Sequence, residues 1–194
     1  MIATAARKSS IAFQAEIQSA YLFPSDLGWM TVSFCGDRLS RVSFGHPSFA
    51  AAAAALPTGT EVAADAGEVP PPIRKTVERL QRFAAGAKDD FSDVELDLSH
   101  LTDFQRRVVK ACRKIKAGQA RSYADLAASA GSPRAARAVG NVMRGNRFPL
   151  IVPCHRVIGS DGKLCGFTSP QGLAMKERLL EREGAQRKSN RRAK

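Results

Sequence analysis

The best candidate for chemistry in this sequence is Cys154, which is followed directly by His155 and Arg156. These three residues interrupt an apolar run over 148–158, and polar residues inside such a run need a reason. Pro153 comes just before the cysteine, where it stops strand pairing and turns the chain. Cationic neighbours lower the pKa of a thiol and favour the nucleophilic thiolate. The pattern favours a cysteine nucleophile over the usual alternative, a small inert core side chain.

A zinc site is a weaker interpretation of the same region. The chain has four cysteines and three histidines, and no two cysteines have the CxxC spacing of a structural zinc site. The available ligands share no recognisable spacing: Cys165, His155, His100 and His46. We therefore expect no metal and no disulfide scaffold, and no special role for the other cysteines, Cys35, Cys112 and Cys165.

Glu183 stands where a carboxylate is unexpected. It ends a helix predicted over 172–183, just before Gly184. A negative charge at a helix C-terminus opposes the helix dipole. Such a group is either solvated or held by a cation, and the sequence leaves both alternatives open.

Charge is divided unevenly along the chain. Residues 1–100 carry 9 Lys or Arg and 12 Asp or Glu, whereas residues 101–194 carry 21 and 6, for net charges of −3 and +15. The tail after Gly184 supplies only +5 of this excess. The asymmetry indicates that the second half meets a polyanion, with nucleic acid favoured over an acidic membrane. The alternative is a solvated basic surface.

The overall composition is that of a globular protein. The chain has 194 residues, of which 44% are hydrophobic and 25% charged, which excludes a wholly disordered chain, a collagen and a coiled coil. No apolar run approaches the ~20 residues that cross a bilayer, so we expect no membrane segment. Residues 1–14 lack acids and faintly resemble a transit peptide, but we favour a cytoplasmic or nucleoid protein with reduced thiols.

The elements that must position the cysteine are mostly helical. Residues 102–116 place apolar side chains on one face, and a capping-box spacing opens a helix over 122–130. After a turn at Gly131, Ser132 is predicted to cap a third helix over 133–145. Two short helices joined by such a turn are typical of a helix-turn-helix.

The helix over 133–145 has an unusual composition. It carries Arg134, Arg137 and Arg144, four small residues and no acid. Small residues let a helix approach another surface closely, so the helix either packs in the core or reads DNA. Three arginines would be costly in a core, which favours DNA.

The first half predicts a small α+β unit. Strands are expected over 16–23, 29–35 and 38–44, and the last two form a hairpin. Helices are expected over 48–55 and 73–85, separated by a loop over 57–72, before an extended segment over 94–98. The predicted division is a flexible N-terminus over 1–14, an α+β domain over 15–98, a DNA-binding and transfer domain over 99–185, and a basic disordered tail over 186–194.

The motif from Pro153 to Val157, with Arg144-Gly145-Asn146 before it, resembles the active-site signature of the O6-alkylguanine-DNA alkyltransferase (methylated-DNA–protein-cysteine methyltransferase) family. The resemblance is strong over 102–184 and weaker over 15–100. Further matching segments follow in the family's order: 104–108, 121–123, 135–140 and 179–184. The resemblance implies a ribonuclease H-like N-terminal domain with a three-stranded antiparallel sheet, followed by a helix-turn-helix of winged-helix type.

The resemblance also implies catalytic roles. Cys154 takes the alkyl group from O6 of guanine, and His155 accepts the thiol proton through a water. Glu183 orients His155, Asn146 braces the turn that carries the cysteine, and Tyr123 assists departure of the guanine. The thioether is stable, so each molecule would act once, as a monomer and without a cofactor.

The implied partner is double-stranded DNA that carries O6-alkylguanine, entered from the minor groove with the damaged base flipped out. Arg137 would fill the vacated stack. The other implied DNA contacts are Tyr123, Ser132, Ser160 and Arg144, and the implied guanine pocket consists of Met143, Val157, Phe167 and Thr168.

One loop departs from the family pattern. Residues 167–172 are two residues longer than in some relatives, and Phe167 stands where tyrosine is often found. In the family this loop covers the pocket. The sequence therefore does not define which size of alkyl group the protein accepts, or whether it prefers O6-alkylguanine or O4-alkylthymine. There are three rival functions: a helix-turn-helix regulator, a cysteine hydrolase, and a non-catalytic damage-binding protein. The last of these would lack a cysteine at position 154, where this chain has Cys154.

Overall fold

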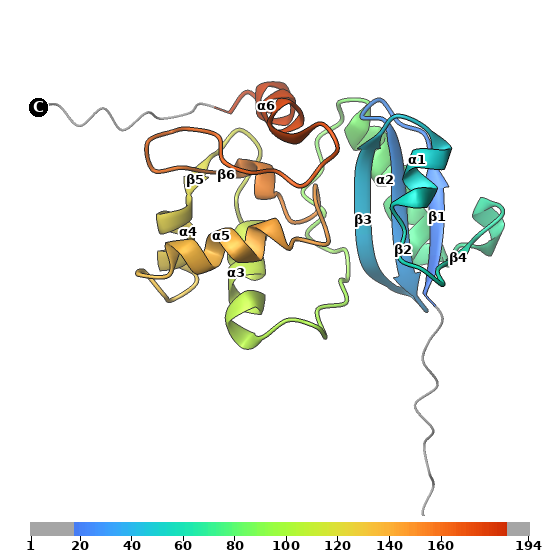
Figure 1. Cartoon of the computed structure of the whole chain (residues 1–194), viewed down its shortest axis with the longest axis horizontal. Helices are drawn as coiled ribbons and strands as arrows, with labels where there is room; N and C mark the ends of the chain where they lie inside the picture. Colours follow the sequence, from blue (N-terminus) through green and yellow to red (C-terminus); the bar gives the residue numbers. More distant parts are fainter. Residues whose placement is uncertain (1–17, 186–194) are drawn as a thin grey trace, which may run out of the picture.

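The computed structural model describes residues 18–185, and the predicted flexible segment 1–14 and basic tail 186–194 lie outside them. A sheet forms one side of the molecule and a group of helices the other (Figure 1). Three of its strands are β1 (Ser19–Phe23), β2 (Trp29–Cys35) and β3 (Arg38–His46), paired antiparallel as predicted.

The strand β2 is buried on both faces. Met30, Val32 and Phe34 face the main core, as their alternation predicts, yet Thr31 and Ser33 are also buried. The reason is a second small apolar cluster, to which Ala52 of helix α1 (Phe49–Ala54) contributes on the opposite face. The alternation of apolar and polar residues over 29–35 predicts a strand buried on one face. That prediction was wrong, because helices cover both faces of the sheet.

The three predicted strands pair antiparallel, but the sheet has one strand more than predicted. A fourth strand, β4 (Glu61–Val62), pairs parallel with β1 and gives the order β3-β2-β1-β4. It lies inside the predicted loop over 57–72. Two residues are too few to show a periodic pattern, so only the pairing partner, β1, defines this strand.

The helix α2 (Pro71–Ala84) packs against the sheet and follows a short 3₁₀ turn, η1 (Ala66–Glu68). Its first turn holds Pro71 and Pro72, which is tolerated because the first N–H groups of a helix have no intrahelical partner. Residues 94–98 make a single bridge, between Leu96 and Leu39.

Three helices form the other half: α3 (Asp103–Arg113), α4 (Tyr123–Ser129) and α5 (Ala136–Arg144). Both α3 and α4 begin with a capping box, made by Thr102 and by Ser122, which confirms the prediction for α4. The pairwise packing of α3, α4 and α5 supports the predicted helix-turn-helix.

The predicted cap of the third helix was wrong. Ser132 does not cap α5, whose first flanking residue is Ala135 and which has no side-chain cap. Instead the carbonyl of Ser132 accepts a hydrogen bond from the Ala135 N–H at 2.9 Å. This closes a turn through Pro133 that delays the start of the helix.

The cysteine segment forms a 3₁₀ turn, η2 (Cys154–Arg156), that leads into β6 (Val157–Ile158). β6 pairs parallel with β5 (Arg121–Ser122), and α6 (Gly172–Arg182) closes the described chain. One apolar cluster runs from β2 to α6, so the two halves share a core. Within residues 18–185, no helix is both long and apolar enough to cross a membrane.

Candidate active site

Asn146 holds the bend that presents Cys154. Its Nδ2 donates to the Val152 carbonyl at 2.9 Å and to Cys154 Sγ at 3.1 Å, while its Oδ1 accepts from the Phe148 N–H at 3.0 Å. Within this bend Leu150 has a φ of 74°, a conformation that non-glycine residues rarely adopt. One amide side chain therefore fixes both the backbone of the bend and the sulfur atom.

Cys154 is buried, and burial raises the pKa of its thiol. The hydrogen bond from Asn146 and the charge of Lys176 act in the opposite direction. The expected net lowering of this pKa was wrong: of the adjacent cationic residues, His155 lowers it through its backbone N–H. The side chains of His155 and Arg156 both bond to Glu183 instead.

His155 and Glu183 form a buried pair. His155 Nε2 lies 3.0 Å from Glu183 Oε1, and the imidazole is completely buried. Burial lowers the pKa of His155, so the ring is neutral at pH 7 and its Nε2–H donates to the carboxylate. The other nitrogen, Nδ1, is then an acceptor, and no group of residues 18–185 forms a hydrogen bond with it. The pair presents a neutral, oriented base.

Arg156 explains the acidic residue, Glu183, at the end of α6. Its Nε donates to Glu183 Oε2 at 2.8 Å and its Nη2 to Oε1 at 2.7 Å, a bidentate ion pair. Burial alone would raise the pKa of Glu183, but the hydrogen bonds from His155 and Arg156 hold it at about 2. Of the two alternatives left by the sequence, the acid is held by a cation.

Lys176 is a buried cation that the sequence analysis missed. Its side chain is fully buried, and Nζ donates to the Val157 carbonyl at 2.6 Å and to the Cys165 carbonyl at 2.8 Å. Burial lowers the pKa of Lys176. The available signal was its position: it lies on the same face of α6 as Leu179 and Leu180, which are buried.

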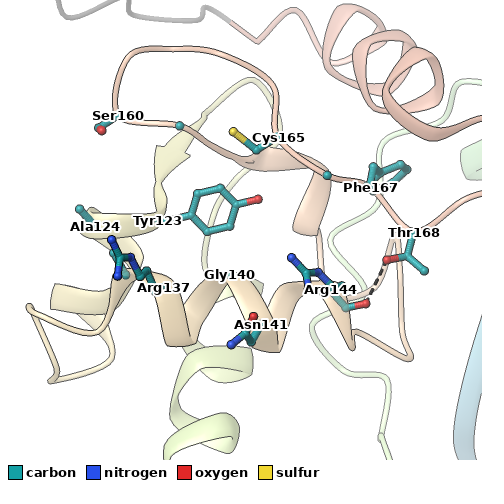
Figure 2. Close-up of a pocket in the computed structure, with 13 residues that line it drawn as sticks. Tyr123, Ala124, Arg137, Gly140, Asn141, Arg144, Ser160, Cys165, Phe167 and Thr168 are labelled. Atoms are coloured by element: carbon teal, nitrogen blue, oxygen red, sulfur yellow. Dashed lines mark hydrogen bonds between the residues drawn. The ribbon is translucent and has the colours of Figure 1, made fainter.

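An open groove of about 790 Å³ lies between α5 and the loop after β6 (Figure 2). We call it the reaction groove. Its lining brings together six of the predicted DNA and pocket residues: Tyr123, Arg137, Arg144, Ser160, Phe167 and Thr168. Figure 2 shows the Tyr123 ring over α5, between Arg137 and Arg144. Segments far apart in the sequence therefore form one surface.

Other predicted residues do not line this groove. Met143 and Val157 are buried in the core, and Ser132 lies in the turn before α5. Cys154 is absent from the lining as well, consistent with its 7% exposure. Within the described residues, no three His, Cys, Asp or Glu side chains gather as a metal site.

The hydroxyl of Tyr123 stays protonated at neutral pH. Burial, followed by the nearby thiols, raises the pKa of its hydroxyl to about 12. The ring lies next to α5: a Cβ at Gly140 would be in ordinary van der Waals contact with Tyr123 Cδ1, at 4.0 Å. The hydroxyl is therefore a hydrogen-bond donor at the groove.

The loop over 167–172 connects the reaction groove to the sheet. The Phe167 and Phe44 rings are 6.1 Å apart in an edge-on arrangement, and Gln171 Nε2 donates to the Gly45 carbonyl at 3.4 Å. On the groove side, Thr168 Oγ1 donates to the Arg144 carbonyl at 3.0 Å. Strand β3 thus supports one wall of the groove.

Comparison with known proteins gives consistent matches. A family model described as "6-O-methylguanine DNA methyltransferase, DNA binding domain" matches residues 103–185. A methylated-DNA–protein-cysteine methyltransferase of Mycobacterium bovis is 50% identical over 107 residues, 55% of this chain and 62% of the relative. The protein of that name from Methanosarcina barkeri is 45% identical over 111 residues, 57% of this chain and 68% of the relative.

Solved structures extend the likeness to the first half of the chain. The crystal structure of Mycobacterium tuberculosis OGT in complex with DNA matches with a TM-score of 0.69 and 36% identity, and covers 85% of this chain and 92% of that one. An O6-methylguanine-DNA methyltransferase from Pyrococcus kodakaraensis, at 24% identity and a TM-score of 0.64, shares the fold over 87% of this chain and 100% of its own.

Proposed function

The chain belongs to the methylated-DNA–protein-cysteine methyltransferase family, and from this premise we propose that Cys154 removes alkyl groups from O6 of guanine in DNA. In the step, the Cys154 Sγ–carbon bond forms as the carbon–O6 bond breaks. The electron pair of the broken bond goes to guanine, which takes up one proton, and the thiol gives one up. The observation that carries the proposal is the sulfur held by Asn146 beside the oriented pair of His155 and Glu183.

The thiol needs a base, because burial raises its pKa. His155 is neutral and its Nδ1 accepts no hydrogen bond, so one water between Nδ1 and Cys154 would carry the thiol proton to the ring. Glu183 stays ionised and stabilises the imidazolium that forms. Arg156 keeps Glu183 in place.

The leaving guanine needs a donor. Tyr123 keeps its proton at pH 7 and lies in the reaction groove, so its hydroxyl is the group we assign to the departing base. In our proposal Phe167 and Thr168 wall the base pocket, and Met143 and Val157 form its floor behind the exposed surface.

The proposed partner is duplex DNA, read from the minor groove by α5. The target atom lies inside the duplex, so the nucleotide must leave the stack at a cost of a few kcal/mol. Arg137 is exposed on α5 and would occupy the vacated space, while Arg144, Ser160 and Ser132 would contact the backbone. The RNase H-like and winged-helix descriptions of the two halves belong to this proposal too.

The proposal implies a single-use protein, because a thioether is stable and no group in the site would remove it. It acts as a monomer, needs no cofactor, and works where the DNA is, in the cytoplasm or nucleoid. O4 of thymine offers the same alkyl–oxygen bond, so it is a second candidate substrate.

The test is intact-protein mass spectrometry after mixing with a duplex that contains O6-methylguanine, followed by peptide mapping. We expect a gain of one methylene mass, once per protein, on Cys154. The Cys154→Ala variant should bind the duplex without the mass gain. A gain on another residue, or none, contradicts the proposal. A parallel duplex with O4-methylthymine defines the range of substrates.

A further inference from the structure

A second concave surface lies between α3 and α4. We call it the basic groove; its volume is about 360 Å³. Four cationic side chains line it, Arg107, Lys110, Lys114 and Arg121, and no acidic residue does. All four are exposed. The groove therefore concentrates positive charge on a face that the reaction groove does not use.

This charge is not neutralised within the protein. Among residues 18–185, none of the four forms an ion pair, whereas Arg79, Arg156 and Lys116 do. Four unpaired cations around one depression repel one another, and a polyanion would relieve that repulsion.

One of the four cations is already positioned. Arg107 Nε donates to the Ala130 carbonyl at 3.2 Å, and its guanidinium carbon lies 6.0 Å from the centre of the Phe104 ring. The side chain therefore bridges α3 and α4, with its remaining N–H groups available. Guanidinium N–H groups suit phosphate oxygens.

The basic groove is continuous with the reaction groove. A third depression joins them: it shares Gln119 and Arg121 with the basic groove, and Ala124 and Ser160 with the reaction groove. Asp125 also lines this depression, but its carboxylate accepts a hydrogen bond from the Ser122 N–H in the α4 capping box. A path for a chain of phosphates therefore runs round the start of α4.

We propose that the basic groove extends the DNA interface and holds phosphates of the duplex flanking the damaged nucleotide. This inference rests on the proposed function, because it assumes that the reaction groove holds the damaged site. The contacts are to phosphates and therefore carry no sequence preference.

The test compares two double variants, each of which removes two positive charges from exposed positions of one helix. Lys110→Gln/Lys114→Gln alters the basic groove, and Arg74→Gln/Lys75→Gln on α2 is the matched control. Binding is measured over a salt series, in a Cys154→Ser background that prevents reaction. Each protein is titrated with a duplex of about one helical turn, ~10 base pairs, and with one three times longer, both carrying O6-methylguanine.

On the long duplex, the negative slope of log affinity against log salt should become shallower by about 0.9 for each lost phosphate contact. For the groove variant, which loses two contacts, the change should be about 1.8. The control should keep the unaltered slope, and the short duplex should show no difference. Equal slopes for both variants on the long duplex overturn the inference. The inference is also overturned if protein already bound to the damaged duplex captures a second, labelled duplex, because the basic groove then binds a separate DNA molecule.

Failure of the proposed function is a separate result. With Cys154 intact, the control variant Arg74→Gln/Lys75→Gln should transfer the methyl group from the short duplex at the unaltered rate. If the unaltered protein itself transfers nothing, the assignment of Cys154 fails, whatever the salt slopes show.

Discussion

At the scale of single residues, the acidity of Cys154 is a balance of opposing effects. Burial disfavours the thiolate, whereas the Asn146 amide and the Lys176 ammonium favour it. Asn146 also holds the backbone, so its loss would disturb the bend itself. Lys176 donates its hydrogen bonds to the carbonyls of Val157 and Cys165, not to Cys154.

We expect Lys176→Met to shift the reaction of Cys154 toward higher pH. Methionine has a similar length but no charge, so the thiolate loses a favourable interaction and the thiol pKa rises. The rate of alkylation by iodoacetamide, followed by mass at Cys154 over a pH series, measures this shift. Two carbonyls lose their donor, which should lower the free energy of unfolding by about 1–3 kcal/mol.

The control is Lys163→Met, since the Lys163 side chain is 82% exposed and forms an ion pair with Asp161, away from Cys154 in the chain. Its profile should match that of the unaltered protein. An unshifted profile for Lys176→Met, with stability lowered, would show that Lys176 has a structural role alone.

The sequence revealed only part of this site. Cys154 stood out because polar residues interrupted an apolar run, and Glu183 because it opposed a helix dipole. The contact that joins the cysteine segment to Glu183 is made by His155 and spans 28 residues, so it was predicted only from the resemblance to a family. Lys176 was missed because a lysine on a surface helix is normally solvated, and only the fold shows that β6 and the next loop cover it.

At the scale of elements, two serines that looked alike in the sequence differ in the structure. Ser122 Oγ accepts the Asp125 N–H at 3.0 Å and so caps α4. Ser132 was predicted to cap α5 but contributes its carbonyl to a turn instead. Both serines precede a predicted helix, but only Ser122 is followed three residues later by an acid, Asp125, whereas the chain after Ser132 closes a turn through Pro133.

We therefore expect different costs for the two substitutions. Ser122→Ala should lower the free energy of unfolding by about 1 kcal/mol, the usual value of a helix cap. Ser132→Ala should change it by less than about 0.5 kcal/mol, as is usual for surface substitutions. Urea unfolding of both variants measures the difference, and equal losses would contradict the assignment of the cap.

Elements with strong periodicity were predictable, and short paired elements were not. The helices α2, α3 and α6 follow apolar spacing and agree with the predicted ranges within a few residues. The two-residue strand β4 depends entirely on hydrogen bonds to Gln18 and Ala20 from a distant segment. No local preference could indicate it.

At the scale of the whole molecule, all three histidines share one tendency. Burial lowers the pKa of His46, His100 and His155 from the ordinary value of 6.5. The unfolded chain therefore binds more protons than the folded one as pH falls through 6.5, and folding loses free energy. Glu183, with a pKa of about 2 against an ordinary 4.5, adds a second loss at lower pH, below 4.5.

The expected result is a free energy of unfolding that is flat above pH 7 and falls between pH 6.5 and 5. Each unit by which a buried histidine's pKa is lowered contributes up to about 1.4 kcal/mol. Urea unfolding at several pH values measures the profile. The His100→Asn variant is altered at an exposed site, so its free energy of unfolding should decrease nearly as much between pH 6.5 and 5. If the free energy of unfolding does not change down to pH 5, the neutral state of His155 is contradicted.

The position of α6 in the chain also has a consequence for biosynthesis. Cys154 leaves the ribosome before the helix that supplies Lys176 and Glu183. His155 and Glu183 are 28 residues apart, so at a synthesis rate of about 5–20 residues per second the thiol waits on the order of seconds for its partners. A chain released early, before α6, would have the nucleophile without its relay. Full reactivity of the thiol would therefore begin only after α6 has been synthesised and has packed against the cysteine turn.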